Sequence, residues 1–140
     1  MLDLDRAAYL LDHEPYTSVF CKGEVTYTSK DRGIFALVKY LTNEVDLKGF
    51  SAADLVVGKA AALLLILAGV KEVYTPVMSE SAIYILAYYG IISRCDRAVP
   101  EILNEARTEV CMIEQCVAHT KSPEAALQLI KNALKNIENI

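Results

Sequence analysis

In the first third of the chain, two segments have hydrophobic residues at helical spacing. Between them lie two short runs with the composition typical of β-strands. The strand-like runs, residues 18–21 and 24–28, are rich in β-branched and aromatic residues. The intervening Lys22-Gly23 favours a tight turn, so the two runs predict a β-hairpin. Helical spacing predicts helices over residues 3–12 and 34–41.

From residue 53 onward, strand patterns alternate with helix patterns. This alternation predicts parallel strands that are joined by right-handed crossover helices. The helix at 59–68 is apolar on every face, which is typical of a covered central helix. The predicted strands are 53–57, 72–77 and 91–95, and the predicted helices are 59–68, 79–89, 100–106, 111–118 and 122–136.

These elements predict a single α/β domain over residues 1–140. The hairpin and the parallel strands give a mixed sheet of about five strands, and helices on both faces make a three-layer α/β/α sandwich. The strands that end at Val57 and Val77 are expected to be neighbours. Two helix N-termini should therefore open onto one crevice at the carboxyl edge of the sheet.

The composition favours a folded, cytoplasmic protein and argues against several classes of partner. Hydrophobic residues make up 54% of the chain and charged residues 23%, which argues against disorder. The net charge of −4 argues against nucleic acid as a partner. The N-terminus is acidic and the apolar run 60–70 is too short for a bilayer, so neither a signal peptide nor a membrane span is expected. In the cytoplasm the scattered cysteines should be thiols: Cys21, Cys95, Cys111 and Cys116.

The segment 54–62 is the most informative part of the chain, because a strand turns at Gly58 and a helix begins at Lys59. First-turn N–H groups have no partner inside a helix, so such a turn forms an anion site. Lys59 would add a positive charge for a phosphate or carboxylate, or else extend to solvent. At the next helix start, Ser79 is expected to cap the helix and Glu80 to complement its dipole, and the same residues can also contact the ligand. The predicted ligand-binding residues are Gly58, Lys59, Ala60, Ser79, Glu80 and Ser81.

The same region leaves catalysis open. A desolvated Lys59 or a thiol of lowered pKa at Cys111 could serve as nucleophile, with Glu80 as acid or base. Cys111 and Cys116 would point about 140° apart on a helix, which argues against a shared metal ion. No metal and no cofactor are predicted. The helical spacing of the tyrosines at 84, 88 and 89 favours packing, while an exposed Tyr88 would suit a homodimer.

Several motifs of the chain are shared with a known family. They are residues 54–62 (Asp-Leu-Val-Val-Gly-Lys-Ala-Ala-Ala), residues 65–74, Ser79-Glu80 with Tyr89-Gly-Ile91, Arg32-Gly33, Cys111 with Glu114, and Ser122-Pro-Glu124. Through them the chain resembles a family of uncharacterised prokaryotic proteins, a domain of unknown function with a cytidine-deaminase-like fold. Many relatives carry a proline after the cysteine that matches Cys111, where this chain has Met112.

The resemblance implies a fold and argues against the chemistry best known for that fold. Zinc-dependent deaminases place His-x-Glu at the start of the central helix and Pro-Cys-x-x-Cys at the start of the next. The matching places hold Gly58-Lys59-Ala60 and residues 76–80, Pro-Val-Met-Ser-Glu, so no zinc ligand remains and hydrolytic deamination is not expected.

The function hypothesis is therefore binding of an anionic small molecule, such as a nucleotide or an ADP-ribose or nucleoside-phosphate derivative. An enzyme that uses Lys59 or Cys111 as nucleophile is one alternative. A non-catalytic interaction module is the other.

Overall fold

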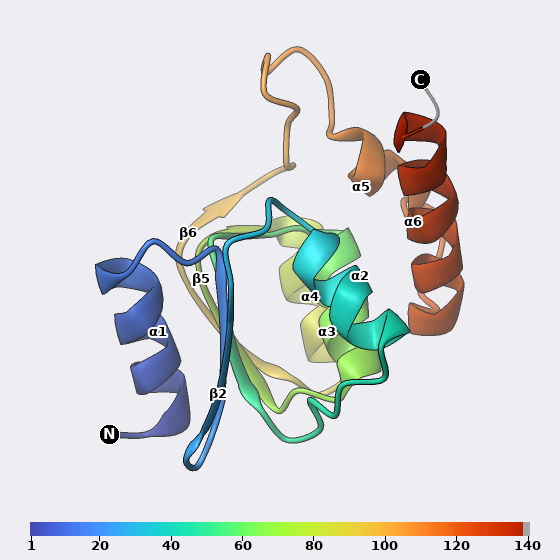
Figure 1. Cartoon of the computed structure of the whole chain (residues 1–140). Coiled ribbons are helices and arrows are strands. Elements are labelled where there is room, and N and C mark those ends of the chain that lie inside the picture. The colour runs from blue at the N-terminus through green and yellow to red at the C-terminus, as the bar shows by residue number, and fades with distance from the viewer. Residues whose placement is uncertain (139–140) are drawn as a thin grey trace.

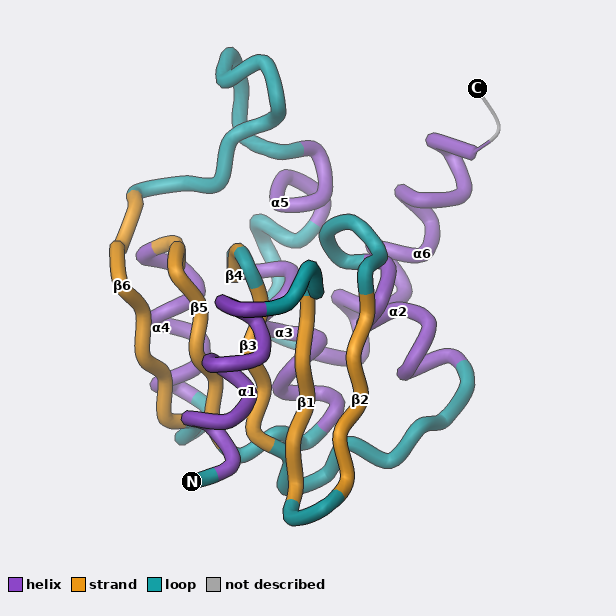
Figure 2. Tube along the Cα trace, turned by 60° about the vertical axis from the view of Figure 1, so that its left-hand side comes forward, coloured by secondary structure: helices purple, strands orange, loops and turns teal. Residues whose placement is uncertain are grey.

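A mixed sheet of six strands forms the centre of the computed structural model, which describes residues 1–138, with side chains through residue 136. The strand order is β2-β1-β3-β5-β4, and β6 pairs with the other edge of β5 (Figure 2). The strands are β1 (Ser18–Lys22), β2 (Val25–Ser29), β3 (Ser51–Asp54), β4 (Val56–Val57), β5 (Glu72–Ser79) and β6 (Ile92–Val99).

The first two strands form the predicted hairpin. β1 and β2 are antiparallel, with Ser18 opposite Ser29 and Lys22 opposite Val25. Gly23 in the turn has a φ of 58°, a left-handed conformation that glycine adopts without steric cost. The other edge of β1 pairs with β3, again antiparallel, so the hairpin joins the parallel part of the sheet.

The strand predicted at 53–57 is in fact two strands, separated at Leu55. The Leu55 N–H donates to Oδ1 of Asp54 at 2.8 Å and to the Thr17 carbonyl at 3.2 Å, bonds that interrupt the pairing with β5. Beyond the break, Val57 lies opposite Met78, which confirms that the strands at 53–57 and 72–77 are neighbours. The break raises the number of strands to six, and β5 and β6 extend further than predicted.

The helices lie on both faces of the sheet (Figure 1). α1 covers one face, and α2, α3 and α4 cover the other, with α6 packed on the outer side of α3. The helices are α1 (Asp3–His13), α2 (Phe35–Thr42), α3 (Lys59–Ala68), α4 (Glu80–Tyr88), α5 (Met112–Cys116) and α6 (Pro123–Glu138). Within residues 1–138, no helix combines the length and apolar character needed to cross a membrane.

Two predictions for the segment after β6 are wrong. Residues 100–106 form no helix; the segment makes an irregular excursion above the sheet, with an isolated bridge between Leu103 and Val110. The helix predicted at 111–118 is limited to α5, which starts at Met112 and ends at Cys116. This excursion rises over the carboxyl ends of the parallel strands (Figure 1).

The central helix α3 is covered as predicted. Its residues 60–65 are all buried, and the helix contacts α2, α4, α5 and α6 as well as β4. The larger hydrophobic core gathers around this helix, with Phe20 and Ala52 contributed by the sheet. A smaller core under α1 takes the alternate residues Val19 and Ala53, as expected of strands that present opposite faces.

Candidate functional site

The N-terminus of α3 holds a carboxylate that comes from the chain itself. The Lys59 N–H donates to Oε1 of Glu114 at 2.7 Å, and the Ala60 N–H donates to Oε2 at 2.8 Å. Glu114 lies in α5, far along the sequence but directly above the first turn of α3. At the strand–glycine–helix turn where an anion site is predicted, the first-turn N–H groups are therefore bound by Glu114 of the same chain.

Gly58 leaves the room that this carboxylate needs. Its φ of −96° is open to any residue, so glycine is not required for conformation. A Cβ at this position would instead overlap the Glu114 carboxylate and lie 2.9 Å from Cγ1 of Ile102. The close approach of Glu114 and Ile102 is what requires glycine here.

Lys59 points along the rim of the same site. Its ammonium group donates to the Ala118 carbonyl at 3.0 Å and so ties the segment after α5 to the start of α3. Desolvation by burial lowers the pKa of Lys59, an effect that the negative charge of Glu114 partly opposes. A partly desolvated cation therefore lies beside the bound carboxylate.

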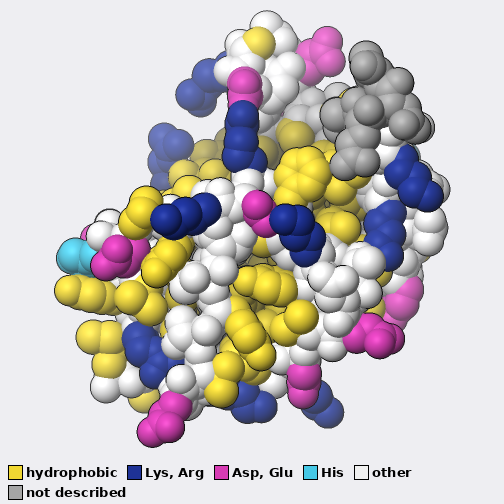
Figure 3. Space-filling model, viewed as in Figure 1, with side chains coloured by type: hydrophobic (Ala, Val, Ile, Leu, Met, Phe, Trp, Pro, Cys, Tyr) yellow, Lys and Arg dark blue, Asp and Glu magenta, His cyan; other side chains and the backbone are white. Residues whose placement is uncertain are grey.

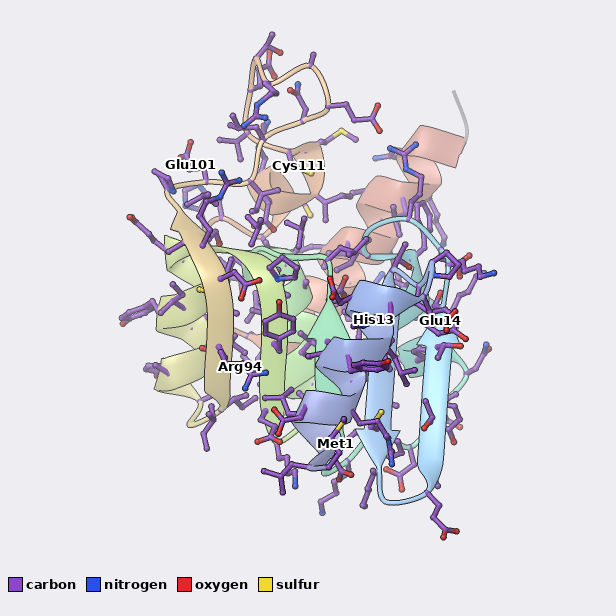
Figure 4. All side chains as sticks on the ribbon, turned by 90° about the vertical axis from the view of Figure 1, so that its left-hand side faces the viewer. Met1, His13, Glu14, Arg94, Glu101 and Cys111 are labelled. Atoms are coloured by element: carbon purple, nitrogen blue, oxygen red, sulfur yellow. The ribbon has the colours of Figure 1, made fainter. Side chains whose placement is uncertain are left out.

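A cavity of about 190 Å³ opens next to these groups. Its lining comes from the first turns of α3 and α4, from the excursion after β6, and from α5 and the segment that follows α5. The lining residues are Lys59, Ser81, Glu101, Ile102, Val110, Glu114 and Ala118. Figure 4 shows Glu101 and Cys111 above the carboxyl edge of the sheet, on the segment that roofs this cavity.

Burial also shifts the acid–base behaviour of Glu114. Desolvation raises the pKa of the Glu114 carboxyl, while the N–H groups of Ala60 and Lys59 and the Lys59 charge act in the opposite direction. Glu101 adds a second carboxyl group to the lining. With both carboxylates ionised, the cavity holds one positive and two negative side chains.

The other predicted site residues are only partly brought together. Ser81 lines the cavity, while the buried Ser79 caps α4 by accepting the Ala82 N–H at 3.1 Å. Glu80 is exposed and does not line the cavity, and neither does Cys111, which is the N-cap residue of α5.

Sequence reasoning missed Glu114 as a site residue. The available signal was its place in the Cys111–Glu114 motif of the family resemblance. Glu101 and Ile102 carry no such signal, because the pattern of residues 100–106 predicts a helix.

The cysteines and tyrosines lie outside the cavity. All four cysteines are free thiols, and the described residues contain no group of three or more His, Cys, Asp or Glu that could hold a metal ion. The packing interpretation of the tyrosines is wrong, because Tyr84, Tyr88 and Tyr89 are 57%, 60% and 40% exposed. The Lys121 ammonium group lies over the rings of Tyr84 and Tyr88, 5.5 and 5.4 Å from their centroids.

The surface drawn in Figure 3 carries charges of both signs. Lys and Arg side chains lie among Asp and Glu and hydrophobic side chains, and neither sign forms a continuous patch on this face. A track of phosphate-binding cations, as expected for a nucleic-acid surface, is not seen on it.

The fold and the cavity define a small mixed α/β domain with a cavity of about 190 Å³ at the carboxyl edge of its sheet. Residues 6–134 match the model of the TM1506 family, a domain of unknown function (DUF1893), and the chain therefore belongs to the DUF1893 family. The crystal structure of a DUF1893 family protein (TM1506) from Thermotoga maritima is similar, with a TM-score of 0.82 and 25% identity over 97% of this chain and 91% of that chain. No curated protein matches the chain.

Asp54, at the end of β3, gives the first prediction. Burial raises the pKa of its carboxyl from 3.8 to about 8, although the Leu55 and Val56 N–H groups favour the charged form. Between these two values the folded chain retains a proton that the unfolded chain has released, so this group lowers stability as the pH rises through that window.

We therefore expect the free energy of unfolding to fall between pH 4 and pH 8 by up to about 1.4 kcal/mol per pH unit from this group. In Asp54→Asn, which keeps a carbonyl oxygen for the Leu55 N–H and cannot ionise, this contribution should vanish. Urea denaturation at several pH values measures it. The exposed Asp12→Asn variant is the control and should keep the wild-type slope; an equal slope in Asp54→Asn would contradict the assignment.

The contact between Gly58 and Glu114 gives the second prediction. Gly58→Ala should destabilise the protein, because the new methyl group displaces the carboxylate from the α3 N–H groups. In a Glu114→Ala background most of that clash is absent, so Gly58→Ala should cost less there, by about 1 kcal/mol or more. A double-mutant cycle by urea denaturation measures this coupling, and strictly additive effects would show that the two residues do not meet.

Proposed function

We propose that this protein binds a small molecule through an anionic group that takes the place of the Glu114 carboxylate. The observation that carries the proposal is the pair of bonds from the Lys59 and Ala60 N–H groups to Glu114. They mark a position where backbone donors, the helix dipole and a nearby lysine all favour negative charge. A carboxylate or phosphate of a ligand would find the same donors.

The size of the cavity limits which part of a ligand it can enclose. Its volume of about 190 Å³ is below the roughly 300–1,000 Å³ of sites that enclose a whole drug-sized ligand. The enclosed part is therefore a phosphate with a portion of a sugar. The base of a nucleotide, or the remainder of an ADP-ribose or nucleoside-phosphate derivative, would lie along the open side.

The cavity already holds the carboxyl groups of Glu101 and Glu114, so a ligand anion enters it by exchange with the Glu114 carboxylate. Glu114 belongs to the short helix α5, so it can leave the N–H groups by a shift of that segment rather than of the sheet. Its raised pKa also favours exchange at lower pH, because a protonated carboxyl is a weaker acceptor for those N–H groups. Ligand binding should accordingly tighten as the pH falls.

We also propose that the arrangement is the three-layer, cytidine-deaminase-like fold implied by the resemblance. Helices on both faces of the mixed sheet and the central position of α3 support it. In that arrangement Gly58-Lys59-Ala60 would stand where zinc deaminases carry His-x-Glu. The lysine would then supply positive charge near the place where related proteins use a metal ion.

Binding is tested by titration calorimetry with inorganic phosphate, ribose 5-phosphate, ADP-ribose and nucleoside monophosphates. Lys59→Met should weaken binding by about tenfold, the loss of one charge-assisted contact. Glu114→Gln should strengthen it several-fold by removing the competing charge. Lys71→Met is the control, because it removes one positive charge at an exposed lysine that does not line the cavity. It should bind like the wild type. Failure of both the wild type and Glu114→Gln to bind any of these anions would overturn the proposal.

A second candidate function is favoured by the lowered pKa of Lys59. An uncharged Lys59 amine can attack an aldehyde to form a Schiff base with loss of water. Lys59 is preferred to Cys111 as the nucleophile because Lys59 lines the cavity.

Incubation with ribose 5-phosphate and cyanoborohydride should then fix the sugar on Lys59 as a secondary amine, detected by peptide mass spectrometry. Lys71 should react only at the background rate of a surface lysine. Equal labelling of the two lysines would rule out an activated amine at Lys59.

A further inference from the structure

The outer edge of β6 has no partner strand within residues 1–138. β6 pairs with β5 over residues 92–99, and it is the outermost strand at that end of the sheet (Figure 2). An exposed edge of eight residues offers a row of backbone donors and acceptors to another strand. The identity of that strand can be argued from the side chains of β6.

Arg94 and Asp96 lie on the same face of the sheet, the one that carries α1. Arg94 approaches Asp5 of α1 at 3.5 Å and lies over the ring of Tyr74, whose hydroxyl donates to Asp96 at 2.7 Å. The Arg94 side chain is still 52% exposed, and Figure 4 shows it on the face of the sheet that carries α1, between β6 and that helix. Cys95, between them in sequence, packs against the core on the other face.

We propose that a second copy of this chain pairs with β6 in antiparallel orientation, about a two-fold axis that passes at Cys95. In this register Arg94 lies opposite Asp96 of the partner subunit, and Asp96 lies opposite Arg94 of the partner subunit. The interface therefore contains two pairs of opposite charges, one on each side of the axis. Ile92, which is 69% exposed, comes to lie opposite Ala98 of the partner subunit.

The charges select this register over its neighbours. A two-fold axis perpendicular to a continuous sheet requires residues that lie opposite one another to point to the same face. The axis must therefore pass at a residue of β6, and each alternative register places it at a different residue. An axis at Arg94 would bring two arginines together, and an axis at Asp96 two aspartates. Like charges directly opposite one another are destabilising, whereas opposite charges stabilise a strand pair.

Charge exchange on the full-length chain tests the register, with sedimentation equilibrium as the measurement. The wild type should be a dimer, and Arg94→Asp or Asp96→Arg should raise the dimer dissociation constant by about tenfold or more. The double variant R94D/D96R restores opposite charges across the axis and should restore dimerisation. Arg97→Asp is the control, because it makes the same charge reversal at a residue that lies opposite the uncharged Ser93 of the partner subunit. This variant should leave the dimer intact.

A second measurement starts from the wild-type chain and uses its native Cys95. Directly opposed residues of antiparallel strands have Cα atoms about 4.5–5.5 Å apart, within the range of a disulfide. Oxidation with diamide should therefore link two copies through Cys95, and the link should be lost in Cys95→Ser and kept in Cys111→Ser. A monomeric wild type, or a dimer that is not linked at Cys95, would overturn the proposal.

Discussion

The burial of α3 on all sides is the constraint on which the rest of the structure depends. A helix without a polar face must be covered by the sheet and by other helices, and α2, α4, α5 and α6 provide that cover. Covering its N-terminus removes water from the first-turn N–H groups, which then need an acceptor from the protein. Glu114 supplies that acceptor, and Gly58 leaves the space for it. The glycine and the distant glutamate are thus consequences of one packing requirement.

Local patterns were sufficient to predict the elements whose signals lie within a few residues. The hairpin at Lys22-Gly23, the apolar helix α3 and the cap at Ser79 are all encoded by adjacent side chains. Residues 100–106 were mispredicted because polar side chains there bond locally instead. Asn104 accepts the Thr108 N–H at 3.0 Å, and Arg107 adopts a left-handed φ of 59°, which a continuing helix does not allow.

The candidate site shows the limit of such reasoning more clearly. The sequence pointed to the place where an anion is held, because the strand, the glycine and the helix start are contiguous. It could not show that Glu114 occupies the place, since that contact spans 55 residues and depends on the path of the segment between β6 and α5. The place of Glu80 at a helix start suggests a site residue, but in the first turn of α4 its side chain lies in solvent.

The segment that roofs the cavity is also the continuation of the sheet edge. β6 ends at Val99, and after Pro100 come the lining residues Glu101 and Ile102. Beyond them the excursion is held by a few backbone bonds, such as that from the Cys111 N–H to the Ile102 carbonyl at 2.9 Å. A second copy paired with β6 would hold the end of this strand in place. It would thereby restrict the conformations of the following segment, which carries Glu101 and Ile102. Pairing at the edge and exchange of Glu114 at the cavity would then act on one continuous stretch of chain.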